Sequence, residues 1–403
     1  MERYDKTVIL AAGGTGGHIF PALSLAAELR GRGYKVILVT DKRSERFVPD
    51  TPELAVRTIY TSPVGGSLFS KVRAAIRIGF GMLQARKMLK QVQPAAVIGF
   101  GGYPSFPTMM SAVRLGVPTI IHEQNSLLGR VNYLLSGKVD AIATSFEDTT
   151  GILERDIAKT TLTGNPVRPN VKVIREMEYP ELQENGTLKL LVIGGSQGAS
   201  VFSEVVPEAL AQLPEERRRR IRVDQQCRPE DIEQVRARYE KLSVSADLAE
   251  FFSNIPSRFA SAHLVICRAG ASTLSELMVA GRPAILVPFP AAKDDHQTVN
   301  ANAMEDAGGG WLLPQDSFTP DVLAKRLDSL LTLPSKLKET AKKSWSAGKV
   351  DADKRLGDVV EKVIFAAAPK VEVAEVSKKD IPEDDVTEEK VDESVLDSME
   401  SRG

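Results

Sequence analysis

The same short unit begins twice in this chain, and that repeat constrains the fold more than any other feature. The apolar run 8–12 leads into a glycine-rich loop at 13–18 (GGTGGH), and the run 190–193 leads into a second such loop at 194–199 (GGSQGA). Each loop is followed by a helical pattern. A strand, a glycine-rich turn and a helix are the first elements of a doubly wound α/β domain. The sequence therefore predicts two similar domains that face one another.

Apolar runs of strand length recur through both halves and alternate with helical patterns, which is typical of parallel sheets with crossover helices. Because the runs are apolar on both faces, we expect helices on both sides of each sheet. The fold class is therefore predicted as α/β, with two Rossmann-like domains. The predicted strands are 7–12, 35–40, 95–99, 119–122 and 141–144, then 188–193, 221–224, 264–267 and 284–288.

The predicted domain boundary lies in residues 164–169 (GNPVRP), where two prolines interrupt regular structure. We expect an N-terminal domain at 1–165 and a C-terminal domain at 166–350. The last helix, at 353–367, could belong to either domain, and we assign it to the first. Residues 370–403 are expected to form an acidic, disordered tail.

The net charge of −1 over 403 residues hides an asymmetry. Residues 370–403 carry 12 acidic and 5 basic side chains, a net of −7, which leaves +6 for residues 1–369. A basic body suits a polyanionic ligand, an anionic membrane surface, or both.

The sequence shows no apolar stretch long enough to span a bilayer and no secretory signal pattern at its start. We therefore expect a cytoplasmic protein. The two cysteines, Cys227 and Cys267, form no CxxC pair. Cys267 ends an apolar run, so we expect it to be a small buried residue rather than a metal ligand or a disulfide partner.

The first glycine-rich loop can approach a ligand closely, and the helix after it, expected to start near Phe20, would point its positive end at an anion. A nicotinamide or flavin dinucleotide site is an alternative, although the spacing differs from GxGxxG. His18 at the loop's end can act as a general base, or it can only shape the turn.

Polar groups also follow strands of the second half. Ser196 and Gln197 lie in the second loop, and small residues at 269–275 open a helix that could offer main-chain N–H groups to a diphosphate. Glu276 could hold ribose hydroxyls, or it could be an ordinary helix acid. The cluster 294–300 (DDHQTVN) could bind sugar hydroxyls; a metal is disfavoured because a second ligand cluster is absent from the sequence.

The segment 67–90 is basic and amphipathic, with apolar residues at helical spacing and no acidic residue. It could lie on an anionic bilayer, or pack on the sheet with a solvated basic face. Its basic residues are Lys71, Arg73, Arg77, Arg86, Lys87 and Lys90.

Seven motifs in order give the chain a family resemblance over about residues 7–366. They are GGTGGH at 13–18, GFGGYPS at 99–105, HEQN at 122–125, GNPVR at 164–168, GGSQGA at 194–199, RAGASTLSE at 268–276, and DDHQ with the following NA at 294–301. In this set the chain resembles the MurG family, glycosyltransferase family 28, which adds N-acetylglucosamine (GlcNAc) to lipid I to form lipid II for peptidoglycan.

The resemblance implies a GT-B fold, with the acceptor on the first domain and UDP-GlcNAc on the second. His18 matches the family's loop histidine, which is a candidate base or an acceptor-positioning group. For the catalytic base we expect His18 first and Glu123 second. The implied donor-binding residues are Thr15, Gly16, Gly17, Asn125, Arg168, Ser196, Gln197, Phe252, Ala271, Ser272, Thr273, Leu274, Ser275, Glu276 and Gln297. The implied acceptor and diphosphate residues are Gly13, Gly14, Gly102 and Tyr103.

The resemblance also implies partners and a location. These are UDP-GlcNAc, lipid I, an anionic membrane surface bound through 67–90, and proteins of cell-wall synthesis and division. The implied location is the cytoplasmic face of the bacterial inner membrane. We expect no nucleic acid partner, no cofactor and no metal. The alternative function is a UDP-sugar epimerase of similar fold.

Overall fold

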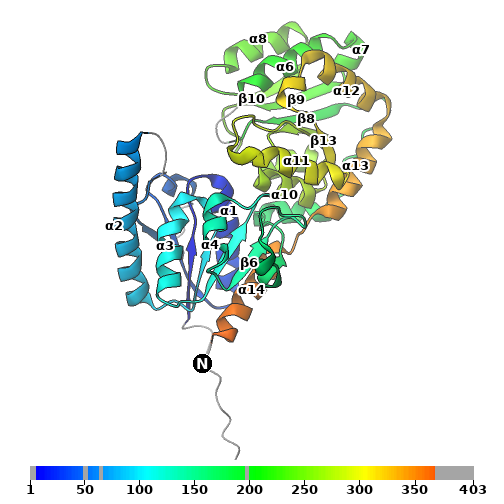
Figure 1. Cartoon of the computed structure of the whole chain (residues 1–403). Coiled ribbons are helices and arrows are strands. Elements are labelled where there is room, and N and C mark those ends of the chain that lie inside the picture. Colours follow the sequence, from blue (N-terminus) through cyan, green and yellow to red (C-terminus); the bar gives the residue numbers. More distant parts are fainter. Residues whose placement is uncertain (1–5, 49–52, 63–66, 196–198, 368–403) are drawn as a thin grey trace, which may run out of the picture. The chain divides into compact units, whose positions relative to one another are not determined.

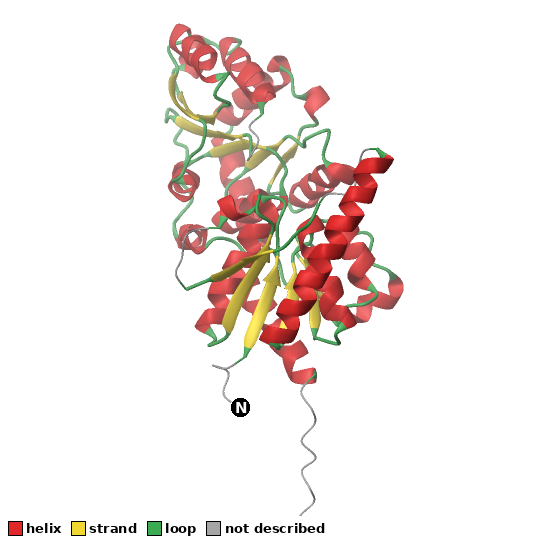
Figure 2. Ribbon diagram, turned by 90° about the vertical axis from the view of Figure 1, so that its left-hand side faces the viewer, coloured by secondary structure: helices red, strands yellow, loops and turns green. Residues whose placement is uncertain are grey.

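The computed structural model describes residues 6–48, 53–62, 67–195 and 199–367. The predicted acidic tail at 370–403 lies outside these residues. All strand pairs within the two sheets are parallel, as predicted. Figure 2 shows the twisted strands with helices packed on them.

The first sheet has seven strands in the order β3-β2-β1-β4-β5-β6-β7. They are β1 (Thr7–Ala11), β2 (Lys35–Thr40), β3 (Ala55–Thr58), β4 (Ala96–Gly99), β5 (Thr119–Glu123), β6 (Ala141–Thr144) and β7 (Thr160–Leu162). Its helices are α1 (Gly16–Gly31), α2 (Leu68–Val92), α3 (Gly102–Arg114), α4 (Arg130–Ser136) and α14 (Ala352–Ala366). One core lies between the sheet, α1 and α14, and another lies on the opposite face under α2, α3 and α4.

The second sheet has six strands in the order β10-β9-β8-β11-β12-β13. They are β8 (Leu188–Ile193), β9 (Ile221–Gln226), β10 (Ser245–Ala249), β11 (Leu264–Cys267), β12 (Ala284–Leu286) and β13 (Gly310–Leu312). Its helices are α5 (Pro169–Lys172), α6 (Ser200–Ala211), α7 (Glu215–Arg218), α8 (Ile232–Lys241), α9 (Ile255–Ser261), α10 (Ala271–Ala280), α11 (His296–Asp306), α12 (Pro320–Thr332) and α13 (Pro334–Ala347). Both sheets share the strand order of a Rossmann fold, with the switch point beside the first strand. Cys267 is fully buried in this half, as expected.

The helix after the first loop begins earlier than the sequence suggested. It was expected near Phe20, but α1 starts at Gly16 and contains Pro21. Pro21 has no N–H, so the carbonyl of Gly17, four residues before it, loses its helical partner. The hydroxyl of Ser272 on α10 donates to that carbonyl at 3.3 Å. A side chain from the second half thereby compensates for a proline in the first.

In two other helices, a side chain also lies within hydrogen-bonding distance of the carbonyl that a proline leaves without its helical partner. Pro107 in α3 frees the carbonyl of Tyr103, which accepts a hydrogen bond from the Thr61 hydroxyl at 3.3 Å. Pro207 in α6 frees the carbonyl of Ser203, and the Arg238 guanidinium lies 3.5 Å away. Each proline is therefore tolerated because a side chain replaces the missing donor.

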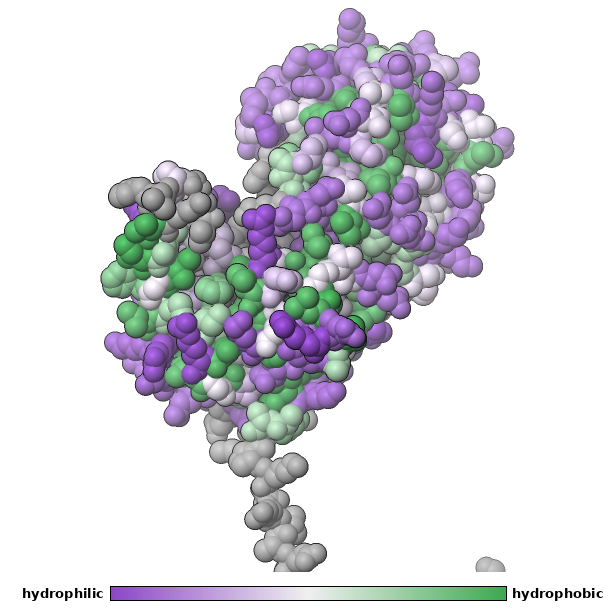
Figure 3. Space-filling view, viewed as in Figure 1, coloured by the Kyte–Doolittle hydropathy of each residue, from purple (hydrophilic) through white to green (hydrophobic). Residues whose placement is uncertain are grey.

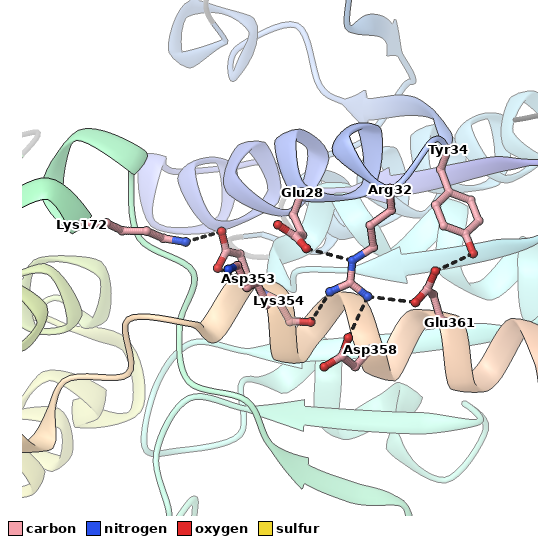
Figure 4. Close-up of polar contacts among 8 residues, drawn as sticks. All are labelled: Glu28, Arg32, Tyr34, Lys172, Asp353, Lys354, Asp358 and Glu361. Carbon is pink, nitrogen blue, oxygen red and sulfur yellow. Dashed lines mark hydrogen bonds and ion pairs between the residues drawn. The ribbon is translucent and has the colours of Figure 1, made fainter. Parts of the chain in front are cut away.

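The last helix, α14, returns to the first sheet and packs on α1 (Figure 1). Arg32 at the end of α1 donates to Asp358 at 2.7 Å, to Glu361 at 2.9 Å and to the carbonyl of Lys354 at 2.7 Å (Figure 4). Lys172 of the second half pairs with Asp353 at the start of α14. These charged contacts fix the returning helix.

Helix α2 carries its large apolar side chains on the outside. Val72, Ile76, Phe80 and Leu83 are more than half exposed, whereas Ala74, Ala85 and Leu89 face inward. Figure 3 shows hydrophobic residues gathered at the surface in this region. In the described parts of the chain, no helix is long and apolar enough to cross a membrane.

Candidate functional site

Helices α1 and α10 bring the site together, because each starts at the carboxyl end of a strand beside its sheet's switch point and the two helices contact one another. Ligands of open α/β sheets bind at such positions. No side chain caps the N-terminus of either helix, so their first N–H groups remain available to an anion.

The first turn of α10 has the form of an anion site. Ala271 is buried, and Ser272 and Thr273 are half-buried. Leu274 lies in the core, and the hydroxyl of Ser275 donates to the Ala271 carbonyl at 2.9 Å. The N–H of Leu274 donates to the Gly270 carbonyl at 3.0 Å, so the N–H groups that this helix start can offer a diphosphate are those of Ala271, Ser272 and Thr273.

Glu276 and Arg168, both predicted donor-binding residues, form an ion pair. Each carboxylate oxygen of Glu276 accepts a hydrogen bond from Arg168 at 2.7 Å. Burial lowers the pKa of Arg168, but the hydrogen bonds and attraction of Glu276 outweigh that effect and leave the pKa above its usual value. A carboxylate offers about four lone-pair sites, so two remain for ribose hydroxyls.

In the first half, two glycine loops pack against each other. A Cβ added to Gly13 would lie 2.7 Å from Cβ of Pro104. A Cβ on Gly102, which has φ +70°, would lie 2.8 Å from the carbonyl oxygen of Gly13 and 3.3 Å from Nε2 of His18. The half-buried His18 imidazole therefore faces the start of α3, where a residue larger than glycine would clash with the Gly13 carbonyl.

Hydrogen bonds from residues after β2 hold the loop after β1 in place. The main-chain N–H of Gly14 donates to the Ser44 hydroxyl at 2.7 Å, and Ser44 in turn donates to Asp41. Burial, followed by the negative charge of Asp41, raises the pKa of the Tyr103 phenol. Tyr103 thus stays a neutral donor beside Gly14, while Thr15 is exposed at the tip of the loop.

Glu123, the second candidate for the base, is almost fully buried at the end of β5. Its carboxylate accepts four hydrogen bonds, two from Asn125 at 3.0 Å, one from Gly129 N–H at 2.8 Å and one from Asn132 at 2.8 Å. These bonds shape the loop after β5 and occupy the carboxylate. They favour His18 as the base.

Asn300 ends the predicted polar cluster 294–300, but the sequence analysis gave it no role of its own. It is fully buried on α11, its amide oxygen accepts from the N–H of Ser126 at 2.8 Å, and its amide nitrogen donates to Asn125 at 3.1 Å and to the Ala269 carbonyl at 3.2 Å. It thus connects the loop after β5 with the segment before α10. The only sequence signal was its place in the last of the seven motifs.

The remaining predicted residues lie around this centre. The side-chain oxygen of Gln297 accepts from the N–H of Phe289 at 2.9 Å, so its amide nitrogen is the group left to donate. Phe252 is buried under the guanidinium of Arg258, 3.7 Å from the ring centroid. Ser196 and Gln197 lie outside the described residues.

Asp294 of the DDHQ cluster forms an exposed ion pair with Arg130 of α4, at 2.6 and 2.9 Å. Within the part of the chain that the structure describes, no group of three or more His, Cys, Asp or Glu side chains is arranged to hold a metal ion.

Solved structures share this architecture. A crystal structure of MurG from Acinetobacter baumannii aligns with a TM-score of 0.72 at 30% identity, over 89% of this chain and 99% of that one. A UDP-GlcNAc 2-epimerase from Neisseria meningitidis, bound to UDP-GlcNAc, aligns with a TM-score of 0.61 at 15% identity, over 88% of this chain and 100% of that one, which shows the fold alone. The protein has the GT-B fold of nucleotide-sugar glycosyltransferases.

The sequence comparisons narrow this class to a family. The N-terminal domain model of glycosyltransferase family 28 matches residues 8–144, and the C-terminal domain model matches residues 189–356. The chain belongs to glycosyltransferase family 28. It is 51% identical, over 89% of its length and 97% of the relative's, to the UDP-N-acetylglucosamine--N-acetylmuramyl-(pentapeptide) pyrophosphoryl-undecaprenol N-acetylglucosamine transferase of Paramagnetospirillum magneticum. The equivalent protein of Rhodospirillum centenum is 50% identical over 88% and 93%.

Proposed function

We propose that the chain transfers GlcNAc from UDP-GlcNAc to the C4 hydroxyl of N-acetylmuramic acid (MurNAc) in lipid I, giving lipid II for peptidoglycan. The observation that carries this proposal is the alignment along nearly the full length of relatives that are named for this transfer. The reaction is a direct displacement in which the acceptor oxygen attacks the anomeric carbon, UDP leaves, and the configuration inverts from α to β.

The donor would lie on the second half of the chain. The N–H groups of Ala271, Ser272 and Thr273 would hold the diphosphate and stabilise the charge that grows on the leaving UDP. Glu276 would accept hydrogen bonds from the ribose, and Gln297 would donate to a sugar hydroxyl. The main chain at Phe252 would contact the uracil.

The acceptor would lie against the glycine loops of the first half. Gly13, Gly14 and Gly102 would leave room for its diphosphate, and Tyr103 would donate a hydrogen bond. His18 would accept the proton of the C4 hydroxyl. General bases contribute about 10²–10⁴-fold, so we expect His18→Ala to reduce turnover by that range while UDP-GlcNAc affinity changes little.

The acceptor is anchored in lipid, and helix α2 offers a surface that suits a bilayer. Tyr60, Val72, Ile76 and Phe80 line a shallow apolar groove together with Arg73 and Arg77. Apolar side chains flanked by arginines match the interface of an anionic membrane. We propose that the enzyme works at the cytoplasmic face of the inner membrane and docks there through α2, where cell-wall and division proteins could contact it.

The test is transfer of radiolabel from UDP-GlcNAc to a lipid I analogue. We expect a labelled lipid-linked disaccharide and equimolar UDP, with no product from UDP-GalNAc. Incubation with donor alone addresses the epimerase alternative, because an epimerase would convert UDP-GlcNAc without any acceptor. Conversion in that tube, or no transfer to the lipid, would contradict the proposal.

A further inference from the structure

Three side chains form a hydrogen-bonded chain that begins at His18 and runs into the protein. Nδ1 of His18 lies 2.7 Å from the amide oxygen of Gln124. The amide nitrogen of Gln124 lies 2.9 Å from Nδ1 of His122 and 3.0 Å from the His122 carbonyl oxygen. Nε2 of His122 lies 3.0 Å from the carbonyl oxygen of Gly164. His122 and Gln124 are both buried.

The direction of each hydrogen bond follows from the inner end of this chain. The carbonyl of Gly164 can only accept, so Nε2 of His122 must carry a proton. Burial lowers the pKa of His122 to about 4, although the hydrogen bond to the Gly164 carbonyl opposes this effect. His122 is therefore neutral, and its Nδ1 is an acceptor.

The orientation of the Gln124 amide is then fixed. Two acceptors, Nδ1 and the carbonyl oxygen of His122, face one end of the amide, so that end must be the NH₂ group. Turning the amide over would place its oxygen against both acceptors. The amide oxygen must therefore face His18, and Nδ1 of His18 must be the donor in that contact.

We propose that Gln124 and His122 are positioning residues that hold His18 in the tautomer with its proton on Nδ1. This leaves Nε2 as the lone-pair nitrogen, and Nε2 lies on the edge of the ring that packs against Gly102, one of the proposed acceptor residues. The inference deepens the proposed function and rests on it, because it states how the protein keeps one nitrogen of the base ready to take the acceptor's proton.

The hydrogen-bonded chain from Gly164 to His18 is anchored at both ends. Its inner end is the carbonyl of Gly164, which has φ +84° and packs so closely that an added Cβ would lie 2.6 Å from Cβ of Lys349. Its outer end is in the first turn of α1, whose Gly17 carbonyl accepts from Ser272. The Asn132 amide also donates to the His122 carbonyl, at 3.1 Å. His18 therefore has little freedom to adopt the other tautomer.

The direct test is histidine tautomer assignment by ¹⁵N–¹H NMR of the free, ¹⁵N-histidine-labelled protein at a pH where histidines are neutral. We expect the proton on Nδ1 in His18 and on Nε2 in His122. His263 is an internal reference, because its Nδ1 accepts the N–H of Lys189 at 2.9 Å and its proton must lie on Nε2. His18→Asn assigns the signal. A proton on Nε2 of His18 would overturn the proposal, whether or not the protein shows transferase activity.

A kinetic test separates positioning from folding. Gln124→Met keeps the shape of the side chain but removes both hydrogen bonds, and we expect kcat to fall about 10- to 100-fold, as for other supporting residues, with KM for UDP-GlcNAc unchanged. In the His18→Ala background the same substitution should cause no further loss.

Ser145→Ala is the matched control. It removes a buried hydrogen bond to the Glu123 carbonyl in the same region but leaves the hydrogen bonds between His18, Gln124 and His122 unchanged. We expect near-normal turnover. An equal loss from Gln124→Met with and without His18 would assign Gln124 a structural role and overturn the proposal. A correct tautomer in a protein that transfers no GlcNAc would contradict the proposed function alone.

Discussion

Arg168 and Glu276 lie 108 residues apart and form a bidentate ion pair, with Nε and Nη2 of the arginine each 2.7 Å from a carboxylate oxygen. Arg168 directly precedes α5, near the start of the segment that joins the two sheets, and Glu276 lies a little over one turn into α10. The pair therefore orients the carboxylate proposed to bind ribose before any donor arrives. It also joins the connecting segment to the second half.

From this pair we expect removal of Arg168 alone to destabilise the protein more than removal of both residues. Arg168→Met leaves the buried Glu276 carboxylate without its cation, so we expect the free energy of unfolding to fall by about 1–3 kcal/mol. Adding Glu276→Met should recover most of that loss, because no buried charge then remains. Urea unfolding of the three proteins measures this. A double variant no more stable than Arg168→Met would show that the carboxylate is not the cause.

Glu276 also predicts an effect on donor binding. Glu276→Gln keeps the size of the side chain but removes the charge, so we expect UDP and UDP-GlcNAc to bind at least about tenfold more weakly, the loss of one charge-assisted hydrogen bond. Calorimetry with UDP measures the Kd without turnover. An unchanged Kd would remove Glu276 from the donor site.

Helix α2 predicts a dependence of membrane binding on charge. Removing two cations with Arg73→Ala and Arg77→Ala should weaken binding to anionic vesicles by roughly 1 kcal/mol per charge, at least about tenfold in total. Vesicle flotation at several salt concentrations measures this. Lys325→Ala with Lys342→Ala removes the same charge from exposed positions on α12 and α13, and should have little effect. Equal losses in both variants would point to general charge attraction.

We expect the buried His122 to contribute to the pH dependence of the free energy of unfolding. Its pKa is about 4 in the folded protein, against a usual 6.5. Between these values the unfolded chain binds a proton that the folded protein does not, so stability falls as the pH drops from 6.5 to 4, by about 3 kcal/mol at most.

The comparison of wild type with His122→Asn isolates this component, because carboxylates titrate alike in both. We expect the stability advantage of the wild type, measured by urea unfolding, to shrink steadily as the pH falls through that range. A constant difference would mean that His122 is protonated in the folded state.

The sequence was sufficient to locate the central strands but not the edges of the sheets. All nine predicted strands are present, and the four strands it missed, β3, β7, β10 and β13, are the four sheet edges. Central strands are covered on both faces, which requires unbroken apolar runs. Edge strands are covered less, and every residue of β3 (Ala55–Thr58) is exposed. No apolar run was therefore available to reveal it.

The glycine loops, the start of α10 and Glu276 could be named from local motifs because their chemistry lies in consecutive residues. Relationships between distant residues could not. The hydrogen bonds of Asn300 to Asn125 and Ser126 span more than 170 positions. The hydrogen bond of Gln124 to His18 spans 106 positions and joins the loop after β5 to the first turn of α1. The roles of the site residues remain predictions.

The central claim is that a nucleotide sugar binds with its diphosphate at the start of α10, opposite His18. A crystal structure of the protein with UDP-GlcNAc tests it most directly. We expect diphosphate oxygens within hydrogen-bonding distance of the N–H groups of Ala271–Thr273 and the ribose hydroxyls on Glu276. A diphosphate bound away from the start of α10 would contradict the account.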